Sequence, residues 1–325
     1  MVRPLGPGRN GGRVPPGVLA AVGVLLIVTG GALALRASGA PTPQAILAQA
    51  APAIAVVRAT VDGRPVSGSA FVIDRDGWLL TAAHVVRRAA GIRVELSGRT
   101  PLEARLAGYD ATRDLAVLRV PASDLPALSL AGRPPRVGEP VVAVAPRARA
   151  DEVRAGQVVG TDVSVPGLAR GAFLRVSIPA RPGMSGGPLL NVRAEVVGVV
   201  VAFSVDASGR RGGLAVSVAA VRDVLPALRA GARVERAWLG VAGDPGARGP
   251  GPEGAAIRQV LPGTPAASAG LRPGDVIVEV DGAPVRSWDD LLVAIGDRRP
   301  GQRVQVVVVR GGQRVALAVT LGVRP

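Results

Sequence analysis

The chain has 325 residues, enough for about two domains of roughly 150 residues each. Hydrophobic residues make up 48% and aromatic residues only 2%, so the predicted cores consist of Val, Leu, Ile and Ala. The net charge is +15, but the arginines are scattered and almost no aromatic residues accompany them for base stacking, so nucleic-acid binding is not expected. The lack of Cys excludes disulfides and thiol catalysis, and a single His, His84, argues against a metal site; no cofactor is expected.

The N-terminus has the features of a membrane anchor. Residues 1–16 carry three arginines and no acidic residue, and residues 17–35 carry no charge at all. An uncharged stretch of this length is close to the roughly 20 residues that cross a bilayer and longer than a signal-peptide core of about 7–15. Because arginines favour the cytoplasmic side, residues 1–16 are expected in the cytoplasm and everything after Arg36 outside.

We therefore expect a transmembrane signal-anchor over residues 17–36, followed by an Ala- and Pro-rich linker over residues 37–49. The alternative is a cleaved signal peptide, with the small residues ASGA at 37–40 as the cleavage site, which would make the protein secreted. Both alternatives place the remainder of the chain outside the cytoplasm.

Residues 50–230 show the pattern of an all-β domain. Short apolar runs are broken by Gly, Pro and Asp, which is typical of a β-barrel or β-sandwich. The runs lie at residues 53–61, 68–73, 77–82, 115–120, 140–145, 195–203 and 213–218. The Pro- and Gly-rich span 126–140 divides them into two halves, as a connector between two small barrels would. Helical spacing over 217–231 then predicts a helix after the barrels.

A second domain is predicted over residues 236–325. It begins with a strand and a short helix, followed by a hairpin that turns at Asp281–Gly282. Ser287 as N-cap and Gly296 as stop bound a predicted helix, and the last two strands turn at Gly311–Gly312. This order of elements predicts a compact α+β module.

His84 is the candidate general base. Hydrolysis of an acyl bond by a serine needs a hydroxyl, a base, a carboxylate that orients the base, and N–H donors for the oxyanion. His84 lies in LLTAAHVV, at the end of an apolar run where an imidazole is costly to bury without a partner. A lone His is more often a satisfied surface or core residue, but this one is the only His in the chain.

Asp114 and Ser185 complete the candidate set. Asp114 immediately precedes the apolar run LAVL and is expected to be partly buried against the imidazole, whereas Asp110 is interpreted as a turn residue. Ser185 lies among three glycines in RPGMSGGPLL. Such a segment is either a plain turn or a loop in which glycines clear space for a reactive hydroxyl and let N–H groups converge. The order His, Asp, Ser favours the reactive loop.

Three segments, TAAHVV, RDLAVL and GMSGGPLL, resemble the catalytic segments of chymotrypsin-fold proteases. With GSAFVIDRDGWLLTAAHVV and a following PDZ-like domain, the chain resembles the HtrA/Deg family of membrane-associated or exported bacterial proteases over roughly residues 50–325. The resemblance implies a mainly β fold, with a chymotrypsin-like double β-barrel protease domain over 50–230, an α+β PDZ domain over 236–325 and one transmembrane helix in front. It implies a catalytic triad of His84, Asp114 and Ser185.

The same resemblance assigns further site residues. Gly183 and Ser185 would supply the N–H groups of the oxyanion hole, with Met184 between them. A strand over 212–218 aligns with the family's substrate-pairing strand and with the wall of its specificity pocket; without a charge, it implies small or medium aliphatic P1 side chains. The substrate-binding residues expected on this strand are Leu214, Ala215 and Val216.

The loop before the nucleophile departs from the family pattern. The family usually has Asn before the nucleophile and Asn-Pro-Gly before that, where this chain has Met184 and Arg181-Pro182-Gly183. Backbone donors do not require Asn, but Arg181 adds a charge near the cleft. Ser177 stands where the family usually has an Asp-containing lead-in. A resting enzyme whose catalytic site is poorly assembled therefore remains an open alternative.

In the C-terminal domain, RAWLGV at 236–241 resembles the carboxylate-binding loop of PDZ domains. Such loops receive a peptide C-terminus on backbone N–H groups, and the peptide then pairs with the adjacent strand. The peptide-binding residues expected are Trp238, Leu239, Gly240 and Val241 in the loop, with Leu292 and Ile295 on the helix. For the last two, a place in the domain core is an equally open alternative.

The resemblance implies a membrane-anchored serine endopeptidase that cleaves unfolded or partly unfolded proteins outside the bacterial cytoplasmic membrane, in quality control or stress signalling. Its expected partners are those substrates, C-terminal peptides at the PDZ groove, and the membrane. A homotrimer is expected from the family, although no Phe, Tyr or Trp lies between residues 41 and 70, where trimer aromatics are common. The alternative is a non-catalytic chaperone or scaffold with a degenerate protease fold, against which the intact triad argues.

Overall fold

The computed structural model describes residues 41–146, 152–165, 167–179, 181–205, 211–243 and 253–324. The expected cytoplasmic segment 1–16, the signal-anchor 17–36 and the cleavage site at 37–40 lie outside the described residues. Within the described part of the chain, no helix combines the length and the apolar character needed to cross a membrane.

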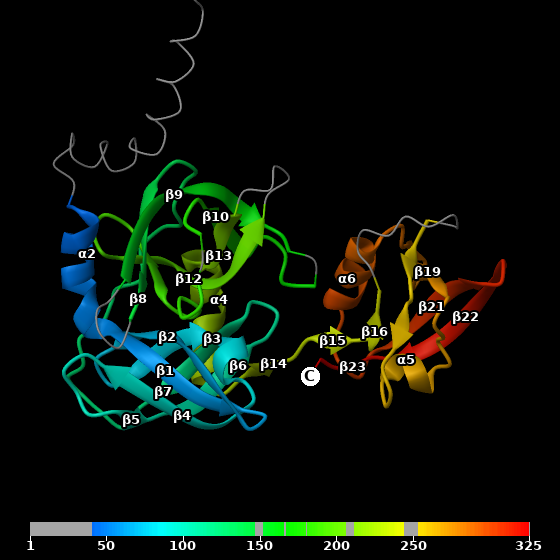
Figure 1. Cartoon of the computed structure of the whole chain (residues 1–325), viewed down its shortest axis with the longest axis horizontal. Coiled ribbons are helices and arrows are strands. Elements are labelled where there is room, and N and C mark those ends of the chain that lie inside the picture. The colour runs from blue at the N-terminus through cyan, green and yellow to red at the C-terminus, as the bar shows by residue number, and fades with distance from the viewer. Residues whose placement is uncertain are drawn as a thin grey trace, which may run out of the picture. The chain divides into compact units, whose positions relative to one another are not determined.

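The second half of the expected linker 37–49 is a helix, which corrects that expectation. Helix α2 (Pro43–Ala50) begins after Thr42, whose hydroxyl accepts the Ala45 N–H at 3.2 Å, and a short 3₁₀ turn, η1 (Ala51–Ala53), follows it. Pro is well tolerated at the first helical position, and Ile46 and Ala50 are buried on one face. This face packs on β8 (Pro140–Ala145) and β9 (Glu152–Val163), so the segment belongs to the folded domain (Figure 1).

The first half of the β domain is an eight-stranded sheet with the strand order β14-β6-β7-β3-β2-β1-β4-β5. Its strands are β1 (Ile54–Val61), β2 (Arg64–Asp74), β3 (Trp78–Ala82), β4 (Ala89–Leu96), β5 (Leu102–Glu103), β6 (Arg105–Asp110), β7 (Leu115–Arg119) and β14 (Arg233–Val234). All neighbours are antiparallel except β14 and β6. In the described residues no pairing joins the two edge strands, so hydrogen bonds do not close this sheet as the expected double barrel implies. Each edge strand has only two residues, which leaves little backbone for such a pairing.

The second half is a closed barrel in the order β10-β13-β12-β11-β8-β9. Its further strands are β10 (Phe173–Val176), β11 (Pro188–Leu190), β12 (Val196–Val205) and β13 (Arg211–Ser217). The expected helix after the barrels is α4 (Val218–Arg229), which starts where the Ser217 hydroxyl accepts the Ala220 N–H and is followed by Gly231 at φ 95°. The connector over 126–140 is largely irregular, as predicted.

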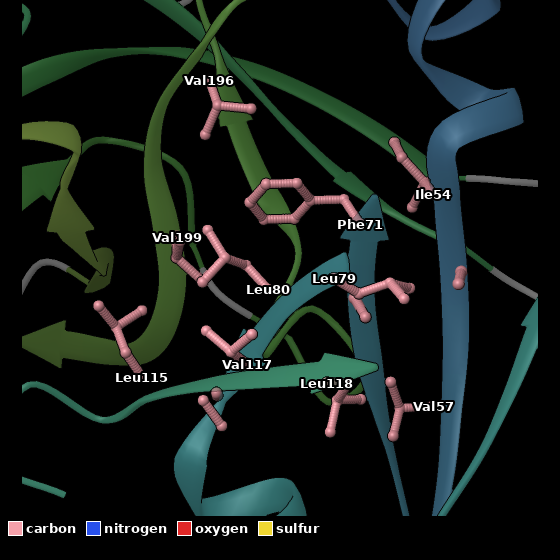
Figure 2. Close-up of a cluster of buried hydrophobic side chains, with 14 of the residues drawn as sticks. Ile54, Val57, Phe71, Leu79, Leu80, Leu115, Val117, Leu118, Val196 and Val199 are labelled. Atoms are coloured by element: carbon pink, nitrogen blue, oxygen red, sulfur yellow. The ribbon is translucent and has the colours of Figure 1, made fainter. Parts of the chain in front are cut away.

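The two halves share an apolar core, and the second barrel has a further buried cluster of its own. In β2, five consecutive residues, 68–72, are buried, so both faces of the strand are covered. Phe71 and Leu80 of the first sheet belong to the same buried cluster as Val196 and Val199 of β12, and Figure 2 shows these side chains lying together. This packing fixes β3 and the segment after it against the barrel that carries Ser185.

The C-terminal domain has its own core. Its main sheet has the order β17-β19-β21-β22 with β20 on β19. Its elements are β15 (Ala237–Trp238), β16 (Val241–Ala242), β17 (Ala255–Ala256), β18 (Gln259–Val260), α5 (Pro265–Ser268), β19 (Val276–Val280), β20 (Ala283–Pro284), α6 (Trp288–Gly296), β21 (Arg303–Arg310), β22 (Gln313–Thr320) and β23 (Gly322–Val323). The predicted hairpin at Asp281–Gly282 is confirmed, with both residues at positive φ (49° and 79°), as a type I′ turn requires. The predicted N-cap Ser287 is confirmed as well, since its hydroxyl accepts the Asp290 N–H.

Candidate active site

His84 lies in α3 (Ala83–Val86), a single helical turn directly after β3, rather than at the end of a strand as its apolar surroundings predicted. Its neighbours Ala83, Val85 and Val86 are buried, whereas the imidazole side chain is 48% exposed. The turn forms because Asp114 binds its first amides: the Asp114 carbonyl accepts the Ala83 N–H at 3.0 Å, and Asp114 Oδ1 accepts the His84 N–H at 2.8 Å.

The structure brings His84 and Asp114 together. His84 Nδ1 and Asp114 Oδ2 are 2.6 Å apart, and the Asp114 side chain is only 16% exposed, as the sequence predicted. Burial on its own lowers the pKa of His84, but the hydrogen bond and the negative charge of Asp114 raise it by more. The pKa of His84 therefore lies above its ordinary value of 6.5. With Nδ1 bound to the carboxylate, Nε2 is the nitrogen left to accept the proton of an attacking hydroxyl.

Asp110 is the turn residue that the sequence predicted. It is fully buried, and its carboxylate accepts the N–H groups of Thr112 and Arg113, the Thr112 hydroxyl and the Arg113 guanidinium, all at 2.6–3.1 Å. These bonds fold the loop so that Asp114 sits at φ 56°, a left-handed conformation that Asp tolerates better than most residues. The carboxylate of Asp110 is therefore fully engaged within its own loop.

A contact that sequence reasoning missed supports the same loop from the connector after α4. Ala111 donates its N–H to the Val234 carbonyl at 2.8 Å, and Arg236 donates its Nε–H to the Ala111 carbonyl at 2.7 Å. Burial lowers the pKa of Arg236 to about 10. The sequence held no signal for this contact, because the partners are more than a hundred residues apart and the RAWLGV motif that contains Arg236 points to peptide binding in the other domain.

The segment before Ser185 is a tight turn. Met184 donates its N–H to the Arg181 carbonyl at 3.1 Å, with Pro182 and Gly183 (φ 92°) between them. Pro followed by a residue at positive φ is the signature of a type II turn, and Gly accepts that conformation without strain. Met184 is 2% exposed, and its Sδ accepts the Arg181 N–H at 3.3 Å. Met184, which replaces the family's Asn, thus closes the turn a second time with its own side chain.

Ser185 follows the turn and lies against the first sheet. The Ser69 N–H donates to the Ser185 carbonyl at 2.8 Å. A Cβ built at Gly68 would come within 2.9 Å of a Val85 methyl and 3.0 Å of the same carbonyl, so the backbone of Ser185 and the α3 turn flank one glycine. Within the described part of the chain, the Ser185 hydroxyl forms no hydrogen bond with the His84 imidazole. Hydrogen bonds between catalytic groups are often long without substrate and shorten when it binds.

The expected substrate-pairing strand is wrong. Leu214, Ala215 and Val216 lie on β13 in the interior of the closed barrel, where β10 pairs with one edge and β12 with the other. Their backbone has no free edge for a peptide, and all three side chains are buried. The sequence marks this segment as a strand, but it does not show that β10 and β12 occupy both of its edges.

The strand that reaches the nucleophile loop is β12. The Gly186 N–H donates to the Val200 carbonyl at 2.7 Å, and the Val200 N–H donates to the Gly187 carbonyl at 2.9 Å. β11 pairs with β12 only as far as Val199. Among the described residues, no strand pairs with this edge beyond Val200, so a free edge begins beside Ser185.

In the C-terminal domain, the structure places all six predicted peptide-binding residues around one hollow: Trp238, Leu239, Gly240, Val241, Leu292 and Ile295. Trp288 and Leu291 line it too, and sequence reasoning missed them although they share the helix. Ile295 also belongs to the domain core, whereas Leu292 does not, so the core alternative applies to Ile295 alone. Leu239 and Gly240 accept backbone bonds from Ala266 and Leu261, while within the described chain their own N–H groups donate none to backbone.

Comparison with known proteins supports both domains. Residues 68–199 match the family model of the trypsin-like peptidase domain, and residues 212–321 match that of the PDZ domain. A probable periplasmic serine endoprotease, DegP-like, of Pseudomonas fulva is 38% identical over 268 residues, covering 79% of this chain and 56% of the relative. A protein of the same description from Hahella chejuensis is 38% identical over 269 residues, covering 80% and 57%. The chain thus spans little more than half the length of these relatives.

Solved structures of serine proteases match the fold of this chain. A serine endoprotease from Yersinia pestis matches with a TM-score of 0.59 at 28% identity, over 88% of this chain and 99% of that one. An HtrA-type protease, AlgW, solved with a tripeptide, matches with a TM-score of 0.56 at 31% identity, over 88% and 98%.

Proposed function

Because the chain belongs to the HtrA/Deg family of serine proteases, we propose that it is a serine endopeptidase with His84, Asp114 and Ser185 as its catalytic triad. The observation that carries the proposal is the 2.6 Å contact between His84 Nδ1 and Asp114 Oδ2, beside a glycine-framed serine held against the same sheet. An imidazole oriented by a buried carboxylate next to a serine is the arrangement that acyl transfer needs.

In the proposed reaction, the Ser185 hydroxyl oxygen attacks the carbonyl carbon of the peptide bond while His84 Nε2 takes its proton. Asp114 holds the ring and stabilises the imidazolium that forms. The N–H groups of Gly183 and Ser185 stabilise the negative charge on the carbonyl oxygen. His84 then gives its proton to the leaving amine. Water hydrolyses the acyl-enzyme by the same route, with His84 again as base, and Ser185 is restored.

The substrate is proposed to be an extended, unfolded segment. The free edge of β12 that begins after Val200 offers backbone groups beside Ser185, and a peptide can add to such an edge as an antiparallel strand. Only a segment without its own tertiary structure can supply that strand, which favours unfolded or partly unfolded proteins. We therefore place substrate pairing at Val201 and the backbone that follows it, in place of β13.

The PDZ domain is proposed to bind peptide C-termini and to regulate the protease. The N–H groups of Leu239 and Gly240 lie beside an apolar hollow lined by Trp238, Leu292 and Ile295. A carboxylate would accept those N–H groups, and an apolar last side chain would enter the hollow.

The location is proposed to be outside the cytoplasmic membrane, with residues 17–36 as anchor or, alternatively, as a cleaved signal peptide. The uncharged stretch 17–35 and the periplasmic assignment of the DegP-like relatives support it. A role in protein quality control or in stress signalling, and assembly into a homotrimer, belong to the same proposal.

Fluorophosphonate labelling of the full chain in detergent tests the catalytic function against the chaperone or scaffold alternative. The missing hydrogen bond between His84 and Ser185 is the observation that favours that alternative. Labelling of the wild type but not of Ser185→Ala, with cleavage of unfolded casein, supports the protease. A wild type that takes no label and cuts no unfolded substrate would overturn it.

A further inference from the structure

Ser69 carries a hydroxyl into a buried apolar stretch of β2. Its side chain is fully buried, and Ala70, Phe71 and Val72 follow it in the core. A buried hydroxyl costs free energy unless it finds a hydrogen-bond partner. The partner of Ser69 lies in the other half of the domain: its Oγ donates to the Gly183 carbonyl at 2.5 Å.

Ser69 binds the nucleophile loop at two points. Besides the bond from its hydroxyl to Gly183, its N–H donates to the Ser185 carbonyl at 2.8 Å. These two carbonyls belong to the two residues whose N–H groups are proposed to stabilise the oxyanion. Ser69 itself is placed against the backbone of the loop and contacts neither substrate nor reacting atoms.

The Gly183 carbonyl is a sensitive point to hold. A glycine at φ 92° has no Cβ to restrict its rotation, so the direction of the peptide planes around it depends on hydrogen bonds. The Met184 N–H bond to Arg181 fixes one side of the turn. The bond from Ser69 Oγ holds the carbonyl oxygen on the opposite edge of the same Gly183–Met184 peptide plane, which limits the rotation of Gly183 and so restrains the direction of its N–H.

The carbonyl of Ser69 extends this link towards His84. It accepts the Thr81 hydroxyl at 2.7 Å, and Thr81 lies on β3 immediately before the α3 turn. The same carbonyl would lie 2.1 Å from a Cβ at Gly186, so only glycine fits at that position. The loop is thus pressed against β2 at the residue after the nucleophile.

We infer that Ser69 is a positioning residue for the oxyanion hole: from the opposite half of the domain it holds the Gly183–Met184 peptide and thereby restrains the adjoining Gly183 N–H. The inference rests on the proposed serine-protease function. Removal of an oxyanion donor typically costs about 10²–10³-fold in kcat, and a loosened donor is expected to cost less, about 10–100-fold. Substrate binding along β12 does not involve Ser69, so KM is expected to change little.

The test compares Ser69→Ala with wild type in the full chain in detergent, with Ser217→Ala as the matched control. Ser217 is also a buried serine, but its hydroxyl caps α4 by accepting the Ala220 N–H. The readouts are kcat and KM for a quenched peptide substrate, and the affinity for a peptide boronic acid, which forms a tetrahedral adduct on the nucleophile. The expected result for Ser69→Ala is a lower kcat and weaker boronate binding, with KM within about twofold and the pH midpoint of kcat/KM unchanged.

A Ser69→Ala protein that folds and keeps wild-type kcat and boronate affinity would overturn the inference while leaving the triad in place. So would equal losses in Ser69→Ala and Ser217→Ala, since these would reflect stability alone. If Ser69→Ala does not fold, Ser69→Cys carries the same test, because its thiol is close in size and a weak donor. An inactive, unlabelled wild type would instead be the failure of the proposed function itself.

Discussion

The two sides of the site are held in different ways. His84 lies in the α3 turn after β3 and Asp114 immediately before β7, the strand that pairs with β3, and the loop before Asp114 is fixed by the buried carboxylate of Asp110. The loop around Ser185 is mostly glycine and depends on bonds from β12 and from Ser69 in the other half. The proposed base and acid thus lie in one half of the domain, with the connector after α4 supporting the Asp114 loop, whereas the loop of the proposed nucleophile is held from both halves. Variants should separate these two kinds of support.

The largest effect is expected for Ser185→Ala. Removal of the hydroxyl takes away the attacking atom, and loss of a serine nucleophile costs on the order of 10⁶-fold in kcat in a well-studied protease of this mechanism. The loop keeps its backbone bonds, so the melting temperature should stay close to wild type. Turnover of unfolded casein and thermal unfolding of both proteins measure this. Undiminished cleavage by the variant would remove Ser185 from the mechanism.

Asp114→Asn should follow, with a loss on the order of 10⁴-fold in kcat, the size seen for the equivalent change in a well-studied serine protease. The amide cannot fix the His84 ring in the required tautomer, although its oxygen can still accept the backbone N–H of His84. Asp110→Asn is the matched variant, because Asp110 is also buried in this loop but lies in contact with Thr112 and Arg113. Asp110→Asn should lower the melting temperature clearly and reduce kcat far less than Asp114→Asn does. A larger kcat loss at position 110 than at 114 contradicts the assignment.

The pH dependence tests His84 directly. A general base must be neutral, so kcat/KM should rise as His84 loses its proton, and the raised pKa puts the midpoint above 6.5. Asp114→Asn removes the negative charge and weakens the hydrogen bond that raise this pKa, so its midpoint should fall. Because His84 is the only His, NMR of the full chain should show one imidazole titration. With substrate ionisation and assembly constant, a gap of more than about one unit between the kinetic and NMR midpoints rules His84 out as the base.

The smallest effect is expected at Met184. Met184→Leu keeps the buried volume but removes the sulfur that accepts the Arg181 N–H, and such a swap usually costs less than about 1.5 kcal/mol of unfolding free energy. We expect a loss of a few-fold in kcat, with stability little changed. Met184→Asn restores an acceptor of the family type and should recover the rate. Equal rates in all three proteins would show that the thioether only fills space.

Much of this arrangement is visible in the sequence, because it rests on short-range signals. The apolar runs predicted the strands. The Asp281–Gly282 pair predicted a turn, because these residue types tolerate the positive φ that the structure shows there. The pairing of His84 with Asp114 followed from motif order and resemblance. Strand order is different: whether β12 or β13 offers an edge depends on partners far away in the chain. The hydrogen bond from Ser69 to Gly183 could not be predicted for the same reason, because no sequence pattern indicates which distant residue a serine in a strand contacts.

The shared core of the two halves has a consequence for the life of the molecule before it is finished. Phe71 and Leu80 pack with Val196 and Val199 (Figure 2). The carbonyl of Gly183 accepts its hydrogen bond from Ser69 on β2. A chain that has folded only its first half therefore has the proposed base without the proposed nucleophile, and its second half alone would leave the Ser185 loop without its bonds from Ser69. The proposed site is complete only once the two halves have folded against each other, so proteolytic activity is expected to appear late in folding.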